Sequence, residues 1–157
     1  MSLAIEAFVE NVRSYCEWIE AREHDLLKAR QLILSLMTSI PYLVAPPSNK
    51  DGDAEYPHKG HDEWKLIHKS LADFPFQYYR EVFDPLEMGN DEPVTGDVHD
   101  DLADIYGDLW HGLQAHESGD GIYAVGHWRE SYFQHWGDHA ASALRAIDQH
   151  YRTERLA

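Results

Sequence analysis

The sequence contains a single cysteine, Cys16, among its 157 residues. One cysteine cannot form an intramolecular disulfide or supply a cysteine-based zinc site, so a disulfide-stabilised scaffold is excluded. Cys16 also continues the helically spaced apolar stripe of Ile5, Phe8, Val12 and Ile19. This spacing predicts a buried thiol that fills the core, in a protein of a reducing compartment.

Basic residues are also scarce, because 13 lysines and arginines stand against 28 aspartates and glutamates and give a formal net charge of -15. Such a charge repels phosphate backbones and anionic lipid surfaces, so we expect neither nucleic acid nor a membrane as a partner. The sequence has no run of roughly 18 apolar residues that could span a bilayer, and its first residues lack a signal-peptide pattern. We expect a cytoplasmic protein whose partner is an unknown small ligand or another protein.

Familiar catalytic motifs are missing as well. The sequence holds no P-loop, no glycine-rich dinucleotide-binding fingerprint and no nucleophile elbow. The sequence does contain 43% hydrophobic residues, including 12% aromatic residues, and this is enough to fill one sizeable core. We therefore expect a single domain over residues 1–157, with an exposed loop at about residues 45–60, where proline, glycine and charged residues lack periodicity.

The first forty residues predict helix. Neither glycine nor proline occurs from Leu3 to Ile40, and apolar residues recur there at helical spacing. The polar residues 22–25 favour a break into two helices, with Asp25 as the N-cap of the second. Pro41 then ends that second helix, because proline lacks the amide donor and clashes with the preceding turn.

The rest of the chain also follows a helical pattern. We expect a third helix at about His61–Phe74, a short helical piece at about Gln77–Phe83, and a long helix that starts after the N-cap Asp97. A turn at 118–121 precedes the last helix, at about Ile122–Arg152. No segment alternates apolar and polar residues long enough to predict a strand. The sequence therefore predicts an all-α fold, an antiparallel bundle of about five helices.

Four polar residues form a stripe on the helix that follows Asp97. Asp101, Asp104, Asp108 and His111 are spaced three, four and three apart, so they share one side of that helix at the edge of its apolar face. Carboxylates at this spacing can hold a hard divalent cation, although acidic stripes are more often solvated faces. We expect the stripe to line a groove.

The last helix carries a histidine pair, His135 and His139, at a spacing of four residues. Such a pair can chelate zinc, copper or nickel when further ligands are present, and it can instead donate to carboxylates of a neighbouring helix. If the two helices pack antiparallel across the turn at 118–121, Asp104 or Asp108 comes within reach of one histidine. The candidate polar groove therefore consists of the following residues: Asp104, Asp108, His111, His135 and His139.

Two acidic pairs suggest an alternative. Glu17 and Glu20 form an E-x-x-E pair, and Asp101 and Asp104 form a D-x-x-D pair. Together they are similar to the helices of all-α nucleoside triphosphate pyrophosphohydrolases, and this resemblance implies a divalent-metal-dependent phosphohydrolase with Mg²⁺ on those four acids. The sequence departs from that family, because Asp101 replaces a glutamate, the two pairs lie further apart, and residues to hold a triphosphate are not obvious.

Three longer strings carry a second resemblance. They are Tyr-Tyr-Arg-Glu-Val-Phe-Asp-Pro-Leu from Tyr78, Asp-Asp-Leu-Ala-Asp-Ile-Tyr-Gly-Asp-Leu-Trp-His-Gly-Leu from Asp100, and His-Trp-Gly-Asp-His-Ala-Ala-Ser-Ala-Leu-Arg-Ala-Ile from His135. In combination they resemble a bacterial, all-helical domain family of unknown function. This resemblance implies a helical fold and a bacterial cytoplasmic setting, and it implies no activity or catalytic residue. The residues favour a binding module for a small ligand or a protein.

Overall fold

The computed structural model describes residues 2–45, 55–89 and 92–156. Its fold is all-α, as predicted, and within the described residues a small two-stranded sheet is the one addition to the helices. The elements follow one another in this order: α1 (Leu3–Glu20), α2 (Leu26–Ser39), η1 (Ile40–Tyr42), α3 (His61–Ser70), η2 (Leu71–Asp73), β1 (Tyr78–Glu81), β2 (Val94–Asp97), α4 (Val98–Glu117), α5 (Gly121–Ser131), η3 (Tyr132–Trp136) and α6 (Gly137–Leu156).

The predicted break in the first forty residues is confirmed. The first helix ends at Glu20, and the second begins after Asp25, whose carboxylate accepts a hydrogen bond from the Lys28 amide. Pro41 lies in the 3₁₀ turn η1, so the α-helix stops just before it. Asp97 likewise caps α4, because its carboxylate accepts from the amides of His99 and Asp100.

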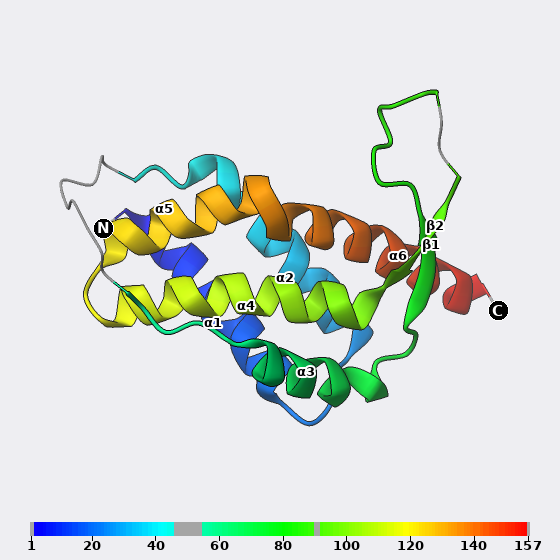
Figure 1. The fold of residues 1–157 in the computed structure, drawn as a ribbon, viewed down its shortest axis with the longest axis horizontal. Helices are drawn as coiled ribbons and strands as arrows, with labels where there is room; N and C mark the ends of the chain where they lie inside the picture. Colours follow the sequence, from blue (N-terminus) through cyan, green and yellow to red (C-terminus); the bar gives the residue numbers. More distant parts are fainter. Residues whose placement is uncertain (1, 46–54, 90–91, 157) are drawn as a thin grey trace.

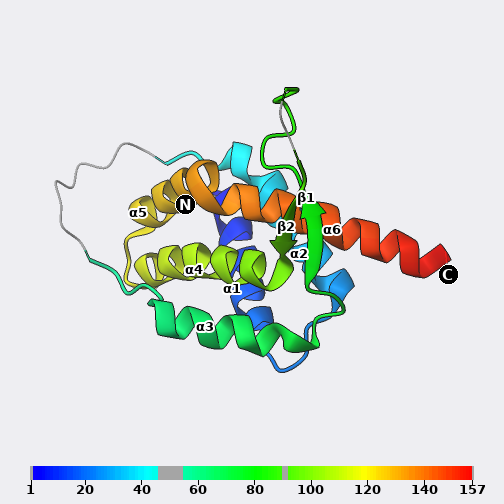
Figure 2. The ribbon, with the colours of Figure 1, turned by 45° about the vertical axis from the view of Figure 1, so that its right-hand side comes forward.

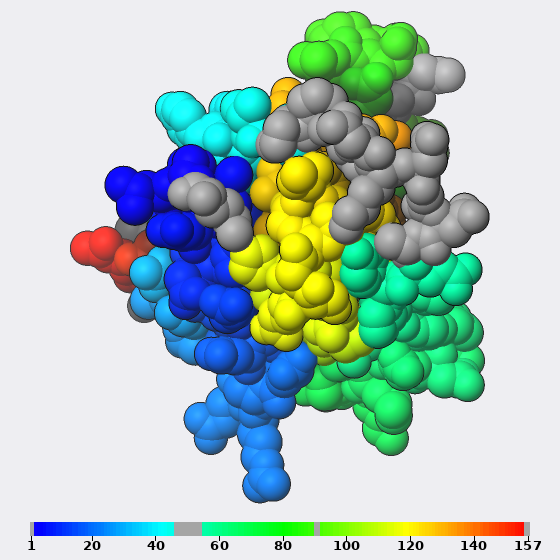
Figure 3. Space-filling view, turned by 90° about the vertical axis from the view of Figure 1, so that its left-hand side faces the viewer, coloured from blue at the N-terminus to red at the C-terminus, as the bar shows by residue number. Residues whose placement is uncertain are grey.

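The helices are arranged so that α4 has neighbours on several sides. Figure 1 shows α3, α4 and the α5–α6 run lying side by side, with α1 and α2 behind them. Helix α4 contacts α1, α3, α5 and α6, while α2 packs on α1 and α6. The α4–α5 turn, drawn in yellow in Figure 3, lies between the blue start of α1 and the green segment that leads into α3.

Two tryptophans of the last helical run lie in the core. Trp128 and Trp136 are both fully buried, and their indole nitrogens donate to the backbone carbonyls of Leu109 and Trp128 respectively. Gly112 of α4 faces the Trp128 indole so closely that a Cβ atom there would overlap it. Cys16 is buried as expected and belongs to the core, and burial raises the pKa of its thiol.

The expectation of a short helix at Gln77–Phe83 is wrong, and so is the expectation that no strand exists. Tyr78–Glu81 forms strand β1, which pairs antiparallel with β2 in the register Tyr78 to Asp97 and Glu81 to Val94. The strands have only four residues each, too few for a period-two pattern to stand out. Figure 2 shows that the part of their connection before residue 90 extends away from the helices, where Phe83, Leu86 and Met88 are 82–91% exposed.

The third helix is also shorter than predicted. It ends at Ser70, and the chain tightens into η2 before Phe74. Residues 46–54 of the predicted exposed loop lie outside the described residues, and residues 55–60 contain no helix or strand. This last segment runs along α4, with the Pro57 carbonyl bonded to His111 and the Tyr56 hydroxyl donating to Asp120.

Candidate functional site

The polar stripes of α4 and of the last helical run meet, as the antiparallel packing predicted. His135 Nδ1 lies 2.7 Å from Asp108 Oδ2, and His139 Nε2 lies 3.2 Å from Asp104 Oδ2. His135 is about half exposed, whereas the side chains of Asp104, Asp108 and His139 are 22–23% exposed. The expectation that one of these carboxylates comes within reach of one of these histidines is therefore confirmed.

Asp104 is the point on which the histidines converge. Its Oδ2 lies 3.2 Å from Nε2 of His139 and 3.9 Å from Nε2 of His135. Its other oxygen, Oδ1, accepts a hydrogen bond of 2.8 Å from the indole nitrogen of Trp64 on α3. The two Nε2 atoms and Oδ2 thus share one small volume, and ligand atoms of these three residues all lie within 4.8 Å of one another.

The remaining ring nitrogen of each histidine is held by a second carboxylate. Asp108 contacts Nδ1 of His135, and Asp101 Oδ1 contacts Nδ1 of His139 at 2.7 Å. Asp101 is buried, and its second oxygen accepts a hydrogen bond from the Tyr79 hydroxyl of strand β1. The sequence placed Asp101 in the polar stripe and in an acidic pair, but it did not predict the bond with Tyr79, because that bond depends on a hairpin that was not predicted.

Burial and nearby polar groups shift the pKa values of Asp101, His139 and Tyr79. Burial, the largest influence on Asp101, raises its pKa above the ordinary value despite the hydrogen bonds from His139 and Tyr79. Burial works against a charged His139, but the Asp101 hydrogen bond and the Asp104 charge outweigh it, so the pKa of His139 is raised. Burial and the bond to Asp101 also raise the pKa of Tyr79, which therefore remains a hydrogen-bond donor.

A π-helical turn, η3, carries His135 into this position. Such turns hold one extra residue and occur frequently at functional sites. The amide of Gly137 donates to the Tyr132 carbonyl five residues earlier, and a Cβ atom at residue 137 would overlap that carbonyl. Glycine is therefore required here for the turn itself.

A pocket of about 410 Å³ opens beside these residues. Asp104, Asp108 and His135 belong to its wall, together with Trp64, Lys59 and Tyr106. The last predicted groove residue, His111, also lines the pocket, but its ring nitrogens are bonded to the Pro57 carbonyl and the Tyr123 hydroxyl. The structure therefore brings the five predicted groove residues to one place, with His111 in the wall and outside the convergent group.

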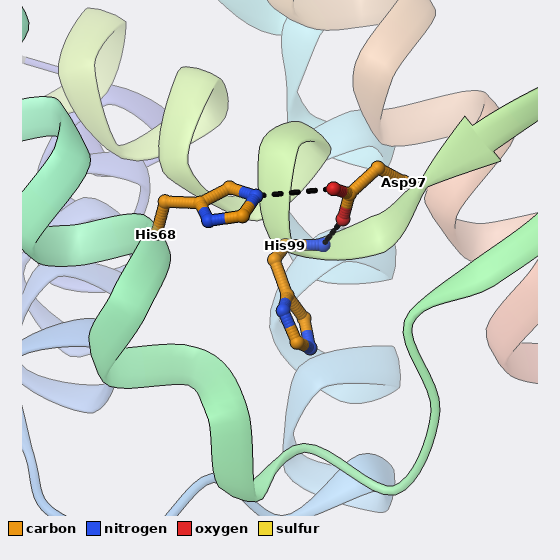
Figure 4. Close-up of side chains that lie close together, drawn as sticks. All are labelled: His68, Asp97 and His99. Carbon is orange, nitrogen blue, oxygen red and sulfur yellow. Dashed lines mark hydrogen bonds and ion pairs between the residues drawn. The ribbon is translucent and has the colours of Figure 1, made fainter.

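A second cluster, which sequence reasoning missed as a group, joins α3 to the start of α4. Figure 4 shows His68 facing the Asp97 carboxylate, at 3.1 Å, while the His99 ring turns away from it. Asp97 is already occupied, because it caps α4 and also accepts a hydrogen bond from Gln77. His68, Asp97 and His99 are close enough to hold a metal ion, yet their contacts are those of a helix cap that ties three segments together.

The acids of the phosphohydrolase alternative do not assemble. Helices α1 and α4 are neighbours, as that alternative requires. However, Glu17 is exposed, and Glu20 accepts a hydrogen bond from the Tyr106 hydroxyl. Asp101 and Asp104 face α6, and in the described parts of the chain neither glutamate belongs to a group of three metal-ligand residues.

Comparison with known proteins gives a family and a fold. The model of the family described as Domain of unknown function (DUF5063) matches residues 1–152. The chain belongs to the DUF5063 family. No curated protein matches the DUF5063 chain. The crystal structure of protein BF1032 from Bacteroides fragilis is similar, with a TM-score of 0.73 and 17% identity over 94% of this chain and 91% of that one.

These comparisons confirm the resemblance to a helical family of unknown function, and they indicate no catalytic activity. At 17% identity the likeness to BF1032 shows the fold alone. Within the described residues, no helix combines the length and apolar character needed to cross a membrane. The chemistry of the site therefore has to be argued from its own geometry.

Proposed function

We propose that this DUF5063 chain is a small-ligand-binding module built around a divalent transition-metal ion, with Asp104, His135 and His139 as the metal ligands. The observation that carries the proposal is the convergence of two histidine Nε2 atoms on one carboxylate oxygen, with both Nδ1 atoms held by other carboxylates. We refer to these three residues as the His₂Asp centre.

The spacing of the donor atoms supports this proposal. Zinc binds histidine nitrogen and carboxylate oxygen at about 2.0–2.2 Å, which puts neighbouring donor atoms about 3.0–3.5 Å apart in common geometries. The Nε2 atom of His139 already lies 3.2 Å from Asp104 Oδ2, and that of His135 lies 3.9 Å away. A small rotation of the half-exposed His135 ring closes the second distance. An ion at this point replaces the two ion-pair contacts of Asp104 Oδ2 with the histidines and leaves the Trp64 bond in place.

The outer contacts support the same proposal. Metal-bound histidines commonly donate their other ring N–H to a carboxylate, which fixes the tautomer and the ring orientation. Asp108 and Asp101 occupy that position for His135 and His139, at 2.7 Å in each case. Trp64 fixes the remaining oxygen of Asp104 in the same way. A histidine pair that only made ion pairs would not need its second nitrogen directed at a shared oxygen.

The ligand types favour a transition metal and leave room for a further ligand. Imidazole nitrogen suits zinc, cobalt, nickel or iron, whereas Mg²⁺ prefers an all-oxygen shell. Three protein ligands leave at least one coordination position free, which is typical of metal sites that act on a bound molecule. Asp104 and His135 both line the pocket of about 410 Å³, a volume that suits a small ligand.

Composition supports the rest of the proposal. The net charge of -15 favours a cationic ligand such as a metal ion and disfavours nucleic acid as a partner. The one cysteine is buried and unpaired, which is consistent with a bacterial cytoplasmic setting. The exposed apolar residues Phe83, Leu86 and Met88 at the projecting hairpin provide a surface for a protein contact.

Calorimetric titration of metal-free protein with Zn²⁺ and with Co²⁺ tests this function. We expect one ion per chain, and we expect His139→Ala and Asp104→Asn to lose more affinity than the roughly 10- to 100-fold lost on removing an outer partner, as in Asp108→Asn. His150→Ala is the matched control, because His150 lies on the same helix and stacks on Phe76 away from the centre. Equal affinities for His139→Ala and His150→Ala would refute the proposal.

A further inference from the structure

Lys59 is the pocket residue whose charge the His₂Asp centre does not use. Its ammonium group lies 4.0 Å from the centroid of the Trp110 ring and 5.8 Å from that of Tyr106. Across the described residues, no carboxylate lies within ion-pair distance of it, although the chain has 28 acidic residues. Lys59 is half-buried, and both Lys59 and Asp104 line the pocket and the adjoining smaller one.

The Lys59 ammonium group, which lies near two aromatic rings and has no ion-pair partner in the described structure, is available to bind an anionic ligand. Aromatic faces attract a cation without satisfying its hydrogen-bond donors, so all three N–H groups of the Lys59 ammonium remain free for a ligand. Carboxylate and phosphate oxygens are the acceptors that bind such a group most strongly. Because the pocket contains both Lys59 and the His₂Asp centre, one small molecule can reach the two together.

The charge of the pocket wall depends on whether a metal ion is bound. The charged residues of the wall are Lys59, Asp104 and Asp108, so with neutral histidines the wall has a formal charge of -1 and repels anions. A bound dication changes this formal charge to +1. With the ion bound, the pocket offers a negatively charged ligand both a coordination position and the Lys59 ammonium group. Without the ion it offers the ammonium group alone, in a wall of net negative charge.

We infer that the ligand of this pocket is a small molecule with an anionic group, carboxylate or phosphate, which coordinates the metal ion of the His₂Asp centre and hydrogen-bonds to Lys59. The inference rests on the proposed metal-binding function and names the ligand class for it. It makes two demands that a generic pocket would not meet. Anion binding requires the metal, and it requires a positive charge at residue 59.

Cobalt spectroscopy tests both demands, since the visible bands of protein-bound Co²⁺ change when its coordination changes. Acetate and inorganic phosphate are titrated separately into Co²⁺-loaded wild type and into metal-free protein, and calorimetry follows the same titrations. We expect saturable binding of at least one anion to the loaded protein, with altered Co²⁺ bands, and none to the metal-free protein. The tighter of the two anions identifies the ligand as a carboxylate or as a phosphate.

Variants of Lys59 separate its role from general electrostatics. We expect Lys59→Met to bind Co²⁺ like wild type but to bind the anion roughly 10- to 100-fold more weakly, the loss expected for one charge-assisted hydrogen bond. Lys59→Arg should retain most of the anion affinity, and Lys65→Met, which removes the same charge from an exposed position on α3, should change nothing.

The two proposals fail in different ways. Co²⁺ that binds at the centre but shows no response to either anion would overturn the ligand class and leave the metal site standing. Equal anion affinity in Lys59→Met and Lys65→Met would overturn it as well. Protein that binds no Co²⁺ at all would remove both proposals.

Discussion

The ring of Tyr79 lies against the backbone of Gly96, its partner across the two-stranded sheet, where any Cβ atom would overlap the ring. From this position the Tyr79 hydroxyl reaches the buried carboxylate of Asp101, which in turn holds His139. The hairpin is thereby linked to the His₂Asp centre. Gly96 in β2 leaves the space for the Tyr79 ring, whose hydroxyl bonds the same carboxylate that contacts His139.

The first prediction tests this link. Tyr79→Phe keeps the ring over Gly96 and removes only the hydroxyl that bonds Asp101. We expect metal affinity to fall roughly tenfold, the lower end of the effect of an outer partner. We also expect the Nδ1 signal of His139 to move in the ¹⁵N NMR spectrum of the metal-free protein. Tyr78→Phe is the control, because Tyr78 is 66% exposed; equal spectra for the two variants would mean that Tyr79 does not orient His139.

The second prediction concerns two glycines of the last helical run. Gly137→Ala places a Cβ atom against the Tyr132 carbonyl, so we expect a loss of about 1–3 kcal/mol in unfolding free energy, as for overpacked positions. Gly126→Ala lies in the same run with open space around it, and there we expect a gain of up to about 1 kcal/mol from helix propensity. Urea unfolding measures both. Changes of the same sign would show that the π-helical turn does not depend on glycine.

A third prediction addresses the core. Trp136 is fully buried and donates to the Trp128 carbonyl, so Trp136→Ala should cost about 3–5 kcal/mol of unfolding free energy. Phe133→Ala removes a 68% exposed ring from the same turn and should stay within about 0.5 kcal/mol of wild type. Chemical denaturation of the two variants is the measurement. A loss below about 1 kcal/mol for Trp136→Ala would put that side chain outside the core.

The fourth prediction is a pH dependence set by His99. Burial, the largest influence, lowers the pKa of this buried histidine below its ordinary value of 6.5, and the nearby Asp97 charge only partly opposes this while His68 adds to it. The folded protein therefore binds fewer protons here than the unfolded chain. The associated stability is present above the unfolded pKa and is lost as pH falls from there toward the folded pKa.

Urea unfolding between pH 7.5 and pH 5 measures this loss, with His99→Leu as the comparison. The Nε2 atom of His99 is buried without a hydrogen-bond partner in the described structure, so leucine should be tolerated there. We expect wild type to lose more stability than His99→Leu as pH falls. Parallel pH profiles would show that His99 has the same pKa in both states.

Much of the fold could be predicted because its signals are local. Helices α2 and α4 begin after Asp25 and Asp97, whose carboxylates cap backbone amides within the first turn. The apolar side chains of the last helical run, Trp128 and Trp136 among them, recur at helical spacing. The meeting of Asp104 and Asp108 with the two histidines also followed from sequence, since a short turn between antiparallel helices fixes which residues lie opposite.

The remainder depends on contacts between segments far apart in the chain. Strand β1 pairs with a strand beyond a long connection, and neither strand has enough residues to show a pattern of its own. The bonds of Trp64 to Asp104 and of Tyr79 to Asp101 depend on how α3 and the hairpin dock on α4. Glycine at residue 137 is ambiguous in sequence, because it fits a close helix approach as well as a π-helical turn.

The π-helical turn also bears on the orientation of His139. The turn lies between two helices with different neighbours. Before the turn, α5 packs on α4, and after the turn, α6 packs on α2 and α4. A one-residue insertion into an unbroken α-helix rotates everything beyond it by roughly 100°. The extra residue of η3 therefore sets the direction in which His139 leaves α6, toward Asp101 and Asp104, separately from the direction of Trp128 in α5.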